Sequence, residues 1–200
     1  MSREAPDRDF WRQRYQEGRI PWDLGAPSEP VKRLAKQHFP PTGAVIVPGC
    51  GRGHEAVFLA ERGYEVAALD IADEAVQAVR DRAAARGVTV HAVRADLFRL
   101  PGVFNERFDV WLEQTCFCAV HPDTWPDYEA TAYRALKPGG LLAGVFMEVP
   151  GDDGPPWNVT PDTIRNVFGD ERRWALEGLD EQPHNPARPG PEFTVRLRRV

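Results

Sequence analysis

Cysteine, lysine and long apolar runs are scarce in this 200-residue chain, and each scarcity excludes a class of protein. Its cysteines, Cys50, Cys116 and Cys118, are odd in number and lack metal-ligand spacing, so we expect neither a disulfide framework nor a metal site. No window approaches the roughly 18 apolar residues of a membrane helix, and residues 1–25 lack the apolar centre of a secretory signal. These absences predict a cytoplasmic protein without a membrane partner.

Positive charge is not in excess either. The chain has 25 Lys and Arg against 30 Asp and Glu, and its formal net charge is −5. Proteins that neutralise several phosphates usually carry a basic surplus or a basic stripe, so nucleic-acid binding is not expected. The 42% hydrophobic and 28% charged residues are typical of a globular protein with its own core. We expect a single domain over residues 1–200 that acts on a small molecule.

Strand and helix patterns alternate along most of the chain. Short apolar runs bounded by glycine or proline predict strands at residues 44–47, 64–71, 88–93, 108–112, 141–147, 174–179 and 193–198. Amphipathic segments predict helices around Trp11 and Tyr15 and at residues 30–38, 55–62, 73–86, 125–136 and 161–168. Residues 137–140 are expected to form a turn. This order predicts an α/β fold with a mainly parallel sheet, whose last two strands pair antiparallel at the edge.

Glycines stand at alternate positions directly after the first expected strand, at Gly49, Gly51 and Gly53. Ligands of open α/β sheets bind beyond the carboxyl ends of the strands, where glycine lets the backbone approach closely. The spacing differs from the G-x-G-x-x-G of dinucleotide binding, so it favours a ligand without a pyrophosphate. A tight strand–helix connection without any ligand is the alternative.

An acid ends the second expected strand, at Asp70. At this position a carboxylate can accept hydrogen bonds from both hydroxyls of a ribose. Helix capping is the other common role of a strand-end acid, and we expect Asp73 to cap the next helix instead. With the glycine loop, Asp70 predicts a nucleoside-binding site.

Two further strand ends carry polar groups toward the same edge of the sheet. Asp96 follows the third strand, where its carboxylate can face the exocyclic amine of adenine while Leu97 packs on the ring. A local Asx-turn explains Asp96 equally well. Glu113 and Gln114 follow the fourth strand. We expect all of these groups at one rim.

These motifs resemble class I S-adenosylmethionine-dependent methyltransferases, and more narrowly the thiopurine S-methyltransferase family with its bacterial members and plant halide/thiol branch. The segments that carry the resemblance are FW at 10–11, PWDLG at 21–25, VPGCGRG at 47–53, LDI at 69–71, TCFCA at 115–119, KPGG at 137–140 and GPPW at 154–157. The resemblance implies a Rossmann-like core at 41–200, a seven-stranded sheet with helices on both faces, and an N-terminal helical lid at 1–40. Val47 stands where most class I enzymes carry an acid.

The resemblance also implies S-adenosylmethionine as the cofactor. The residues implied to hold it are Trp11, Tyr15 and Trp22 over the cofactor, Gly49 and Gly51 at the methionine part, Asp70 at the ribose, Asp96 and Leu97 at the adenine, and Gln114 at the amino-acid end. A sulfonium cation is attracted to aromatic faces, which suits the aromatic residues of the lid. For Trp11 and Tyr15 alone, a helix that merely packs on the domain is the alternative.

Methyl transfer from a sulfonium is an in-line displacement, so the protein mainly aligns the acceptor and excludes water. A thiolate or a halide needs no general base, whereas an alcohol does. The candidate bases are Glu113, His121, His54 and Glu148, and a structural role at the start of a helix is the alternative for His54. Phe117, Met147 and Trp157 are expected to form an apolar substrate pocket.

We therefore predict methyl transfer to a small thiol, thiolate or similar soft nucleophile such as a thiopurine, sulfide or halide. O- or N-methylation by the same fold and a non-catalytic cofactor-binding module are the alternatives. Cys116 and Cys118 alternate about Phe117 as on a strand, so they are expected to face opposite sides. The family resemblance implies a monomer.

Overall fold

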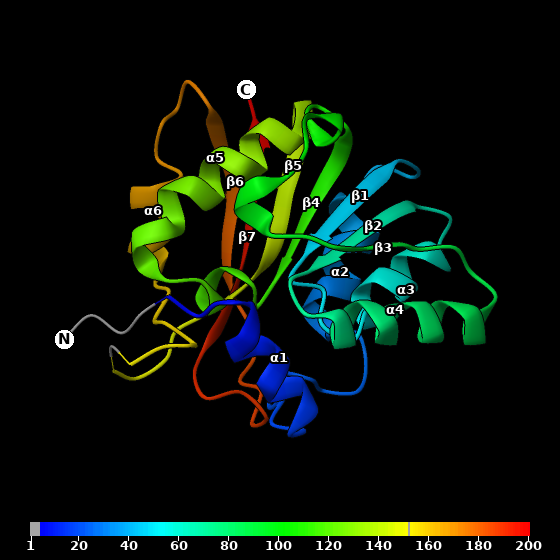
Figure 1. The fold of residues 1–200 in the computed structure, drawn as a ribbon. Helices are drawn as coiled ribbons and strands as arrows, with labels where there is room; N and C mark the ends of the chain where they lie inside the picture. Colours follow the sequence, from blue (N-terminus) through cyan, green and yellow to red (C-terminus); the bar gives the residue numbers. More distant parts are fainter. Residues whose placement is uncertain (1–4, 152) are drawn as a thin grey trace.

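The computed structural model describes residues 5–151 and 153–200, which fold around a seven-stranded sheet (Figure 1). The strands are β1 (Ala44–Pro48), β2 (Glu65–Asp70), β3 (His91–Arg94), β4 (Phe108–Gln114), β5 (Leu136–Met147), β6 (Trp174–Glu181) and β7 (Glu192–Arg199). Their order is β3-β2-β1-β4-β5-β7-β6. Strands β1 to β5 are parallel, and β7 is antiparallel to both of its neighbours. The predicted α/β sheet and its antiparallel edge are confirmed.

Helices cover both faces of this sheet (Figure 1). They are α1 (Arg8–Gln16), α2 (Glu29–His38), α3 (His54–Ala60), α4 (Asp73–Arg86), α5 (Trp125–Ala135) and α6 (Pro161–Val167). Helices α5 and α6 lie on one face, and α2, α3 and α4 lie on the other. None of these described helices is long and apolar enough to cross a membrane.

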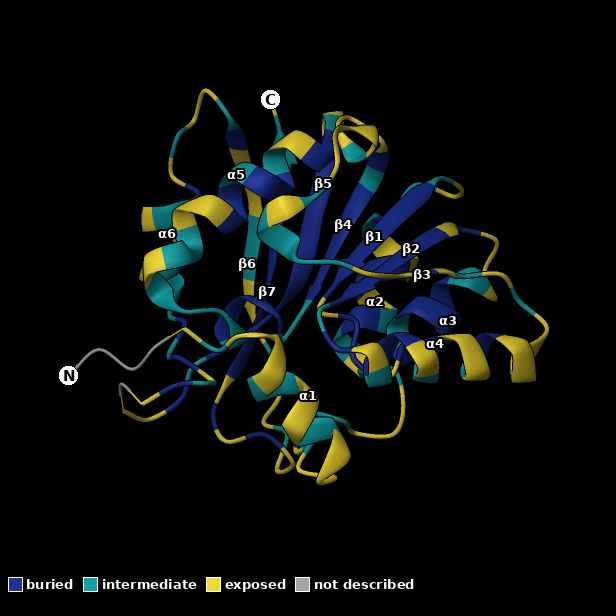
Figure 2. Ribbon diagram, in the orientation of Figure 1, coloured by how far each residue is buried: buried dark blue, intermediate teal, exposed yellow. Residues whose placement is uncertain are grey.

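The alternation of side chains along each strand divides the core between these two faces. In β1, Ala44 and Ile46 pack under α5 and α6, whereas Val45 and Val47 pack under α2, α3 and α4. Because both faces are covered, β1 is buried along its whole length and β2, β4 and β5 along most of theirs, as Figure 2 shows in dark blue. This explains why they are nearly continuous apolar runs in the sequence.

The sheet order reverses direction between β1 and β4. From β1 the chain proceeds through β2 to β3 on one side, and β4 starts the series that proceeds to β5 on the other. Connections therefore leave the carboxyl ends of β1 and β4 in opposite directions, which opens a crevice between the two strand ends. The glycine loop after β1 and Gln114 at the end of β4 meet at this crevice.

The N-terminal segment lies across the same end of the sheet. Asp7 caps α1, because its carboxylate accepts from the backbone N–H of Phe10 at 2.9 Å. The helix attaches to the start of α4: Arg8 donates to Asp73 at 2.5 Å, and Gln16 donates to Glu74 at 2.8 Å. Of the predicted lid, residues 1–4 lie outside the described residues.

Two local predictions about the strands were wrong. Residues 137–140 are not a separate turn but the first part of β5, because Leu136 already pairs with Phe108 of β4. The pairing then shifts register before Val110 meets Leu141, and the shift accommodates the two glycines. Strand β3 begins at His91 and not at residue 88.

Two predictions about side chains were also wrong. Asp73 does not cap α4, whose N-cap is Ala72 without a side-chain hydrogen bond. Cys116 and Cys118 do not alternate as on a strand, because residues 117–119 form a short 3-10 helix. Both thiols are buried in the core cluster under α5 and α6.

Candidate active site

A cavity of about 50 Å³ lies at the crevice between the ends of β1 and β4. It is lined by the lid turn from Trp22 to Ser28, by the glycine loop, by Gln114 and Thr115 after β4, and by Arg188 from the loop between β6 and β7. Ligand pockets for small molecules usually measure about 300–1,000 Å³, so this space is too small for an adenosyl cofactor in the conformation of this structure.

The glycine loop has a left-handed backbone at all three alternate glycines, with φ of +52° at Gly49, +54° at Gly51 and +74° at Gly53. A Cβ atom at Gly49 would lie 2.7 Å from Cys116 Sγ, and one at Gly53 would lie 2.7 Å from Val79 Cγ2. These two glycines permit close packing of the protein on itself. Gly51 instead faces the lid, where a Cβ would only reach ordinary contact.

Asp70 at the end of β2 ties this loop to the sheet. Its carboxylate accepts from the backbone N–H of Gly51 at 3.0 Å and from that of Ala72 at 2.9 Å. Burial raises the pKa of Asp70 to about 6, although these two hydrogen bonds act to lower it. The Asp70 carboxylate thus lies beneath the glycine loop at the end of β2 and also stabilises the loop itself.

The lid aromatics form one cluster over the loop. The Trp22 ring meets Trp11 edge-on at 5.5 Å between centroids, and Tyr15 at 5.8 Å. The Tyr15 hydroxyl lies 3.6 Å from the position of a Cβ at Gly51, and burial and the nearby Asp70 raise the pKa of Tyr15. Tyr15 therefore lies beside the carboxylate that we expect to receive the ribose. Trp11 contacts Trp22 but is not among the described residues that line the cavity.

Contacts that sequence reasoning missed hold the lid turn closed. His54 Nε2 lies 2.8 Å from Asp23 Oδ1, which also accepts from the backbone N–H of Gly25 at 2.9 Å. Arg188 donates to the carbonyl oxygen of Trp22 at 3.2 Å and to Glu192 at 3.1 Å. The pairing of Asp23 with His54 could not be predicted from the sequence, because it joins a turn to a helix 31 positions away.

Ser28 connects the end of the lid to two polar groups of the core. Its backbone N–H donates to Glu55 Oε1 at 3.1 Å, and its hydroxyl donates to Gln114 Oε1 at 2.9 Å. The amide nitrogen of Gln114 is buried and has no hydrogen-bond partner among residues 5–151 and 153–200. Burial raises the pKa of Glu55. The cavity thus contains a carboxyl group and a free donor.

The structure does not bring every predicted cofactor residue to this cavity. Asp96 accepts from the backbone N–H of Phe98 at 2.9 Å, which is the local Asx-turn, the alternative to an adenine contact. Its carboxylate lies 3.5 Å from Arg99, and Leu97 packs against the core cluster under α5. Both residues follow β3, beyond the described lining of the cavity.

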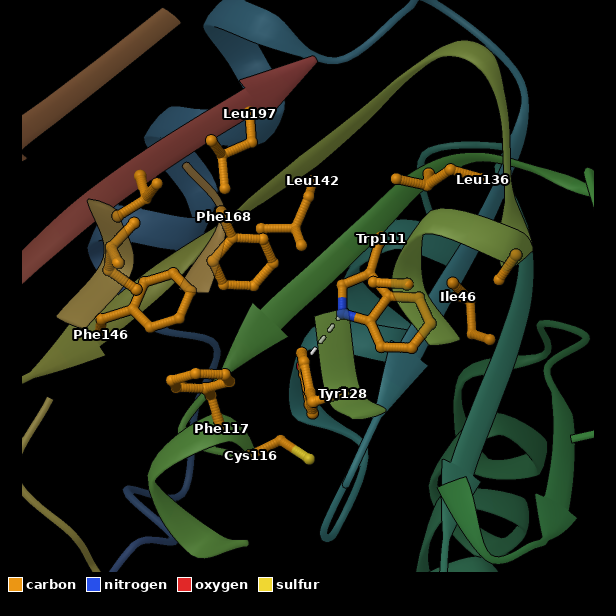
Figure 3. Close-up of a cluster of buried hydrophobic side chains, with 14 of the residues drawn as sticks. Ile46, Trp111, Cys116, Phe117, Tyr128, Leu136, Leu142, Phe146, Phe168 and Leu197 are labelled. Atoms are coloured by element: carbon orange, nitrogen blue, oxygen red, sulfur yellow. Dashed lines mark hydrogen bonds between the residues drawn. The ribbon is translucent and has the colours of Figure 1, made fainter. Parts of the chain in front are cut away.

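Glu113 is fully buried on the far side of β4 from the cavity. Its carboxylate accepts from the backbone N–H of Cys116 at 2.7 Å, from that of Phe117 at 2.9 Å, and from the Tyr128 hydroxyl. Burial raises the pKa of Glu113 to about 7 despite these hydrogen bonds. Tyr128 also accepts from Trp111, as the dashed line in Figure 3 shows. Glu113 therefore holds the loop after β4 in place.

The other predicted catalytic and substrate residues lie together beside this loop. His121 meets Trp157 edge-on at 5.3 Å, and the backbone N–H of Trp157 donates to Cys118 at 2.8 Å. Phe117 stacks on Trp125 at 4.9 Å within the cluster of Figure 3, which Met147 joins. Within the described part of the chain, none of His121, Phe117, Met147 and Trp157 lines the cavity.

The donors and acceptors around the cavity fit an S-adenosyl cofactor. Gly51 offers close backbone approach, the Asp70 carboxylate lies directly behind it at 3.0 Å from the Gly51 N–H, and the buried Gln114 nitrogen can meet a carboxylate. Among the described residues, no group of His, Cys, Asp and Glu side chains is placed to hold a metal ion. The sheet order and this site define a Rossmann-like class I methyltransferase fold.

The family follows from comparison with known proteins. A family model described as thiopurine S-methyltransferase matches residues 6–190. The chain belongs to this family and is an S-adenosylmethionine-dependent methyltransferase.

Several relatives illustrate the range of the family and the fold. Thiocyanate methyltransferase 1 of Brassica oleracea is 29% identical and covers 98% of this chain and 88% of its own length. A 2-heptyl-1-hydroxyquinolin-4(1H)-one methyltransferase of Mycobacteroides abscessus is 30% identical over 80% of this chain and 71% of its own. A 1,6-didemethyltoxoflavin-N1-methyltransferase of Burkholderia thailandensis, solved with S-adenosylhomocysteine, superposes with a TM-score of 0.77 at 22% identity, covering 96% and 87% of the two chains.

Proposed function

We propose that this protein transfers the methyl group of S-adenosylmethionine to a small thiol, thiolate or similar soft nucleophile. The observation that carries the proposal is the placement of the candidate bases: Glu113 is enclosed in the core, His121 lies against Trp157, and His54, which does line the cavity, is held by Asp23 at 2.8 Å. A thiolate or a halide needs no base, so such a site suits it. The names of the thiocyanate and thiol methyltransferase relatives support the same acceptor class.

We assign the cofactor to the cavity and the space that the lid vacates when it opens. In this assignment Gly49 and Gly51 contact the methionine part, and Asp70 accepts from the ribose hydroxyls. Tyr15 and Trp22 close over the sulfonium, with Trp11 behind them. Asp96 and Leu97 remain the proposed adenine contacts, which requires the adenine to extend past the end of β3. When bound, the cofactor supplies an electrophilic methyl group, and the chain aligns the acceptor and excludes water.

A second candidate is methylation of a hydroxyl oxygen, which the quinolone methyltransferase relative favours. An oxygen acceptor with a high pKa needs a base, and His121 is the candidate nearest to the expected substrate side. Phe117, Met147 and Trp157 would then form the apolar wall for either acceptor. The two candidates differ in their dependence on pH.

Turnover with S-adenosylmethionine over a panel of acceptors tests the proposal. The panel contains an aromatic thiol, hydrogen sulfide, iodide, thiocyanate, a thiopurine and a phenol, and the product S-adenosylhomocysteine is quantified. We expect turnover with the sulfur compounds or the halide and none with the phenol. With a thiol, the rate should follow the thiolate fraction of the substrate, and His121→Ala should leave this profile unchanged. Turnover confined to the phenol and lost in His121→Ala would support the second candidate instead.

Opening of the lid predicts a fluorescence change on cofactor binding. Because Trp22 forms the roof of the cavity, its emission should change when S-adenosylhomocysteine displaces it. We expect the change to disappear in Trp22→Phe and to persist in Trp174→Phe, a matched substitution at the start of β6, at the opposite end of the sheet. An unchanged signal in Trp22→Phe would show that the lid turn does not move.

The cellular setting belongs to the same proposal. We infer a cytoplasmic monomer in which residues 1–40 act as the lid of a catalytic core at 41–200, with a small molecule and no nucleic acid as its partner. The net charge of −5 and the unpaired cysteines support this setting.

A further inference from the structure

The cavity contains two carboxyl groups, Asp23 and Glu55, and they differ in what they already bind. Oδ1 of Asp23 is held by His54 and by the Gly25 N–H, and its Oδ2 faces the cationic Arg52 at 3.5 Å. Glu55 accepts from the Ser28 N–H at 3.1 Å. A carboxylate has about four acceptor positions, so Glu55 retains room for a further donor.

The free acceptor positions of Glu55 matter because the end of β1 carries no acid. Val47, where most enzymes of this fold class have an acid, is an apolar residue packed in the core cluster beneath α2 and α3. The strand end therefore offers no carboxylate to a cationic ligand group. Glu55 enters the same cavity from the first turn of α3, on the other side of the glycine loop.

The nitrogen of Gln114 supplies the complementary half of a zwitterion site. It is a buried donor without a partner in the described part of the chain, while its oxygen is held by the same Ser28 that holds Glu55. Ser28 thus fixes an acceptor and a donor at one end of the cavity. An α-amino acid presents a cationic donor and an anionic acceptor on one carbon, which matches this pair.

We propose that the Glu55 carboxylate receives the α-ammonium group of the cofactor's amino-acid part, while Gln114 Nε2 donates to its α-carboxylate. This inference rests on the proposed function and adds the residue that replaces the missing strand-end acid. Burial raises the pKa of Glu55, and the hydrogen bond from the Ser28 N–H and the nearby Arg188 act in the opposite direction. Binding of an ammonium group would also stabilise the ionised form of Glu55.

Calorimetric titration with three nucleosides tests this assignment without using turnover. They are S-adenosylhomocysteine, its analogue with hydrogen in place of the α-amino group, and 5′-methylthioadenosine, which lacks the amino-acid part. We expect the wild type to bind S-adenosylhomocysteine about 10- to 100-fold more tightly than the deaminated analogue. In Glu55→Gln this ratio should fall to a few-fold, with the Kd of 5′-methylthioadenosine unchanged. Glu61→Gln, at the exposed end of α3, should keep the wild-type ratio.

The ratio of the Kd values for the deaminated analogue and S-adenosylhomocysteine, measured within one variant, distinguishes lost recognition of the ammonium group from lost folding. If Glu55 only anchors Ser28, Glu55→Gln will weaken all three nucleosides by the same factor, the ratio will stay at its wild-type value, and the proposal is overturned. If that variant does not fold, Glu55→Asp, which retains the charge on a shorter side chain, should show a reduced ratio, and a wild-type ratio there would contradict the assignment. A wild type that binds none of the nucleosides contradicts the proposed function itself.

Discussion

Asp70→Ala should weaken S-adenosylhomocysteine binding by about 1–3 kcal/mol, or roughly 5- to 150-fold in Kd. The substitution removes the acceptor that we assign to the ribose hydroxyls. It also leaves the N–H groups of Gly51 and Ala72 without their partner, so the glycine loop loses its attachment to β2. Titration calorimetry measures the affinity, and thermal unfolding should show a lower Tm for the same variant.

The control for this experiment is Asp162→Ala in α6. Asp162 is exposed and pairs with Arg165 away from the cavity, so its removal should leave the affinity within about twofold of the wild type. Asp70→Asn retains the side-chain volume and one acceptor, and should fall between the wild type and Asp70→Ala. Unchanged affinity in Asp70→Ala would defeat the assignment of the ribose site.

Glu113→Ala should reduce the free energy of unfolding by about 3–5 kcal/mol, because three buried donors lose their common acceptor. The Tyr128 hydroxyl and the N–H groups of Cys116 and Phe117 would remain in the core without water. Urea unfolding measures the change. Glu61→Ala, which removes an exposed acid paired with Arg86, should change stability by less than about 1 kcal/mol. A loss in Glu113→Ala no larger than that of the control would contradict the structural role.

The same residue predicts the sign of a pH effect on stability. Burial raises the pKa of Glu113 in the folded state to about 7, whereas the unfolded chain titrates at about 4.3. The folded state therefore binds the proton more tightly, and this stabilisation is present at low pH and is lost as the pH rises to about 7. The raised pKa of Asp70 changes stability with pH in the same direction, so the contribution of Glu113 has to be isolated. We therefore compare the free energy of unfolding of the wild type with that of Glu113→Gln at about pH 5 and about pH 8. Glu113→Gln should lose less stability over this interval.

Features that depend on local sequence were predictable. The alternation of residues in β1 and the apolar runs around it follow from burial on both faces, and the Asp7 cap follows from side-chain chemistry at a helix start. By contrast, residues 137–140 have the composition of a turn but belong to β5, because pairing between Leu136 and Phe108 extends the strand. That pairing is a tertiary contact and has no local signal.

The residues of the candidate site divide in the same way, into those with a local sequence signal and those placed by tertiary contacts. Gly51, Asp70 and Gln114 stand at strand ends, and the rule that strand ends meet at one edge was sufficient to place them together. Glu55 resembled an ordinary acid in the first turn of a helix, which favours the helix dipole without any ligand. Its contact with Ser28 spans 27 residues of sequence, so its place in the cavity required the folded structure.

The hydrogen bond from Arg188 to the Trp22 carbonyl joins residues 166 positions apart in the sequence. During synthesis the lid turn therefore leaves the ribosome 166 residues before the arginine that secures it. Domains generally fold as units while their synthesis proceeds from the N-terminus. We therefore expect a nascent chain that stops before residue 188 to form much of the sheet yet lack a closed cofactor site. Acquisition of the methyl donor is then a late event in the life of each new molecule.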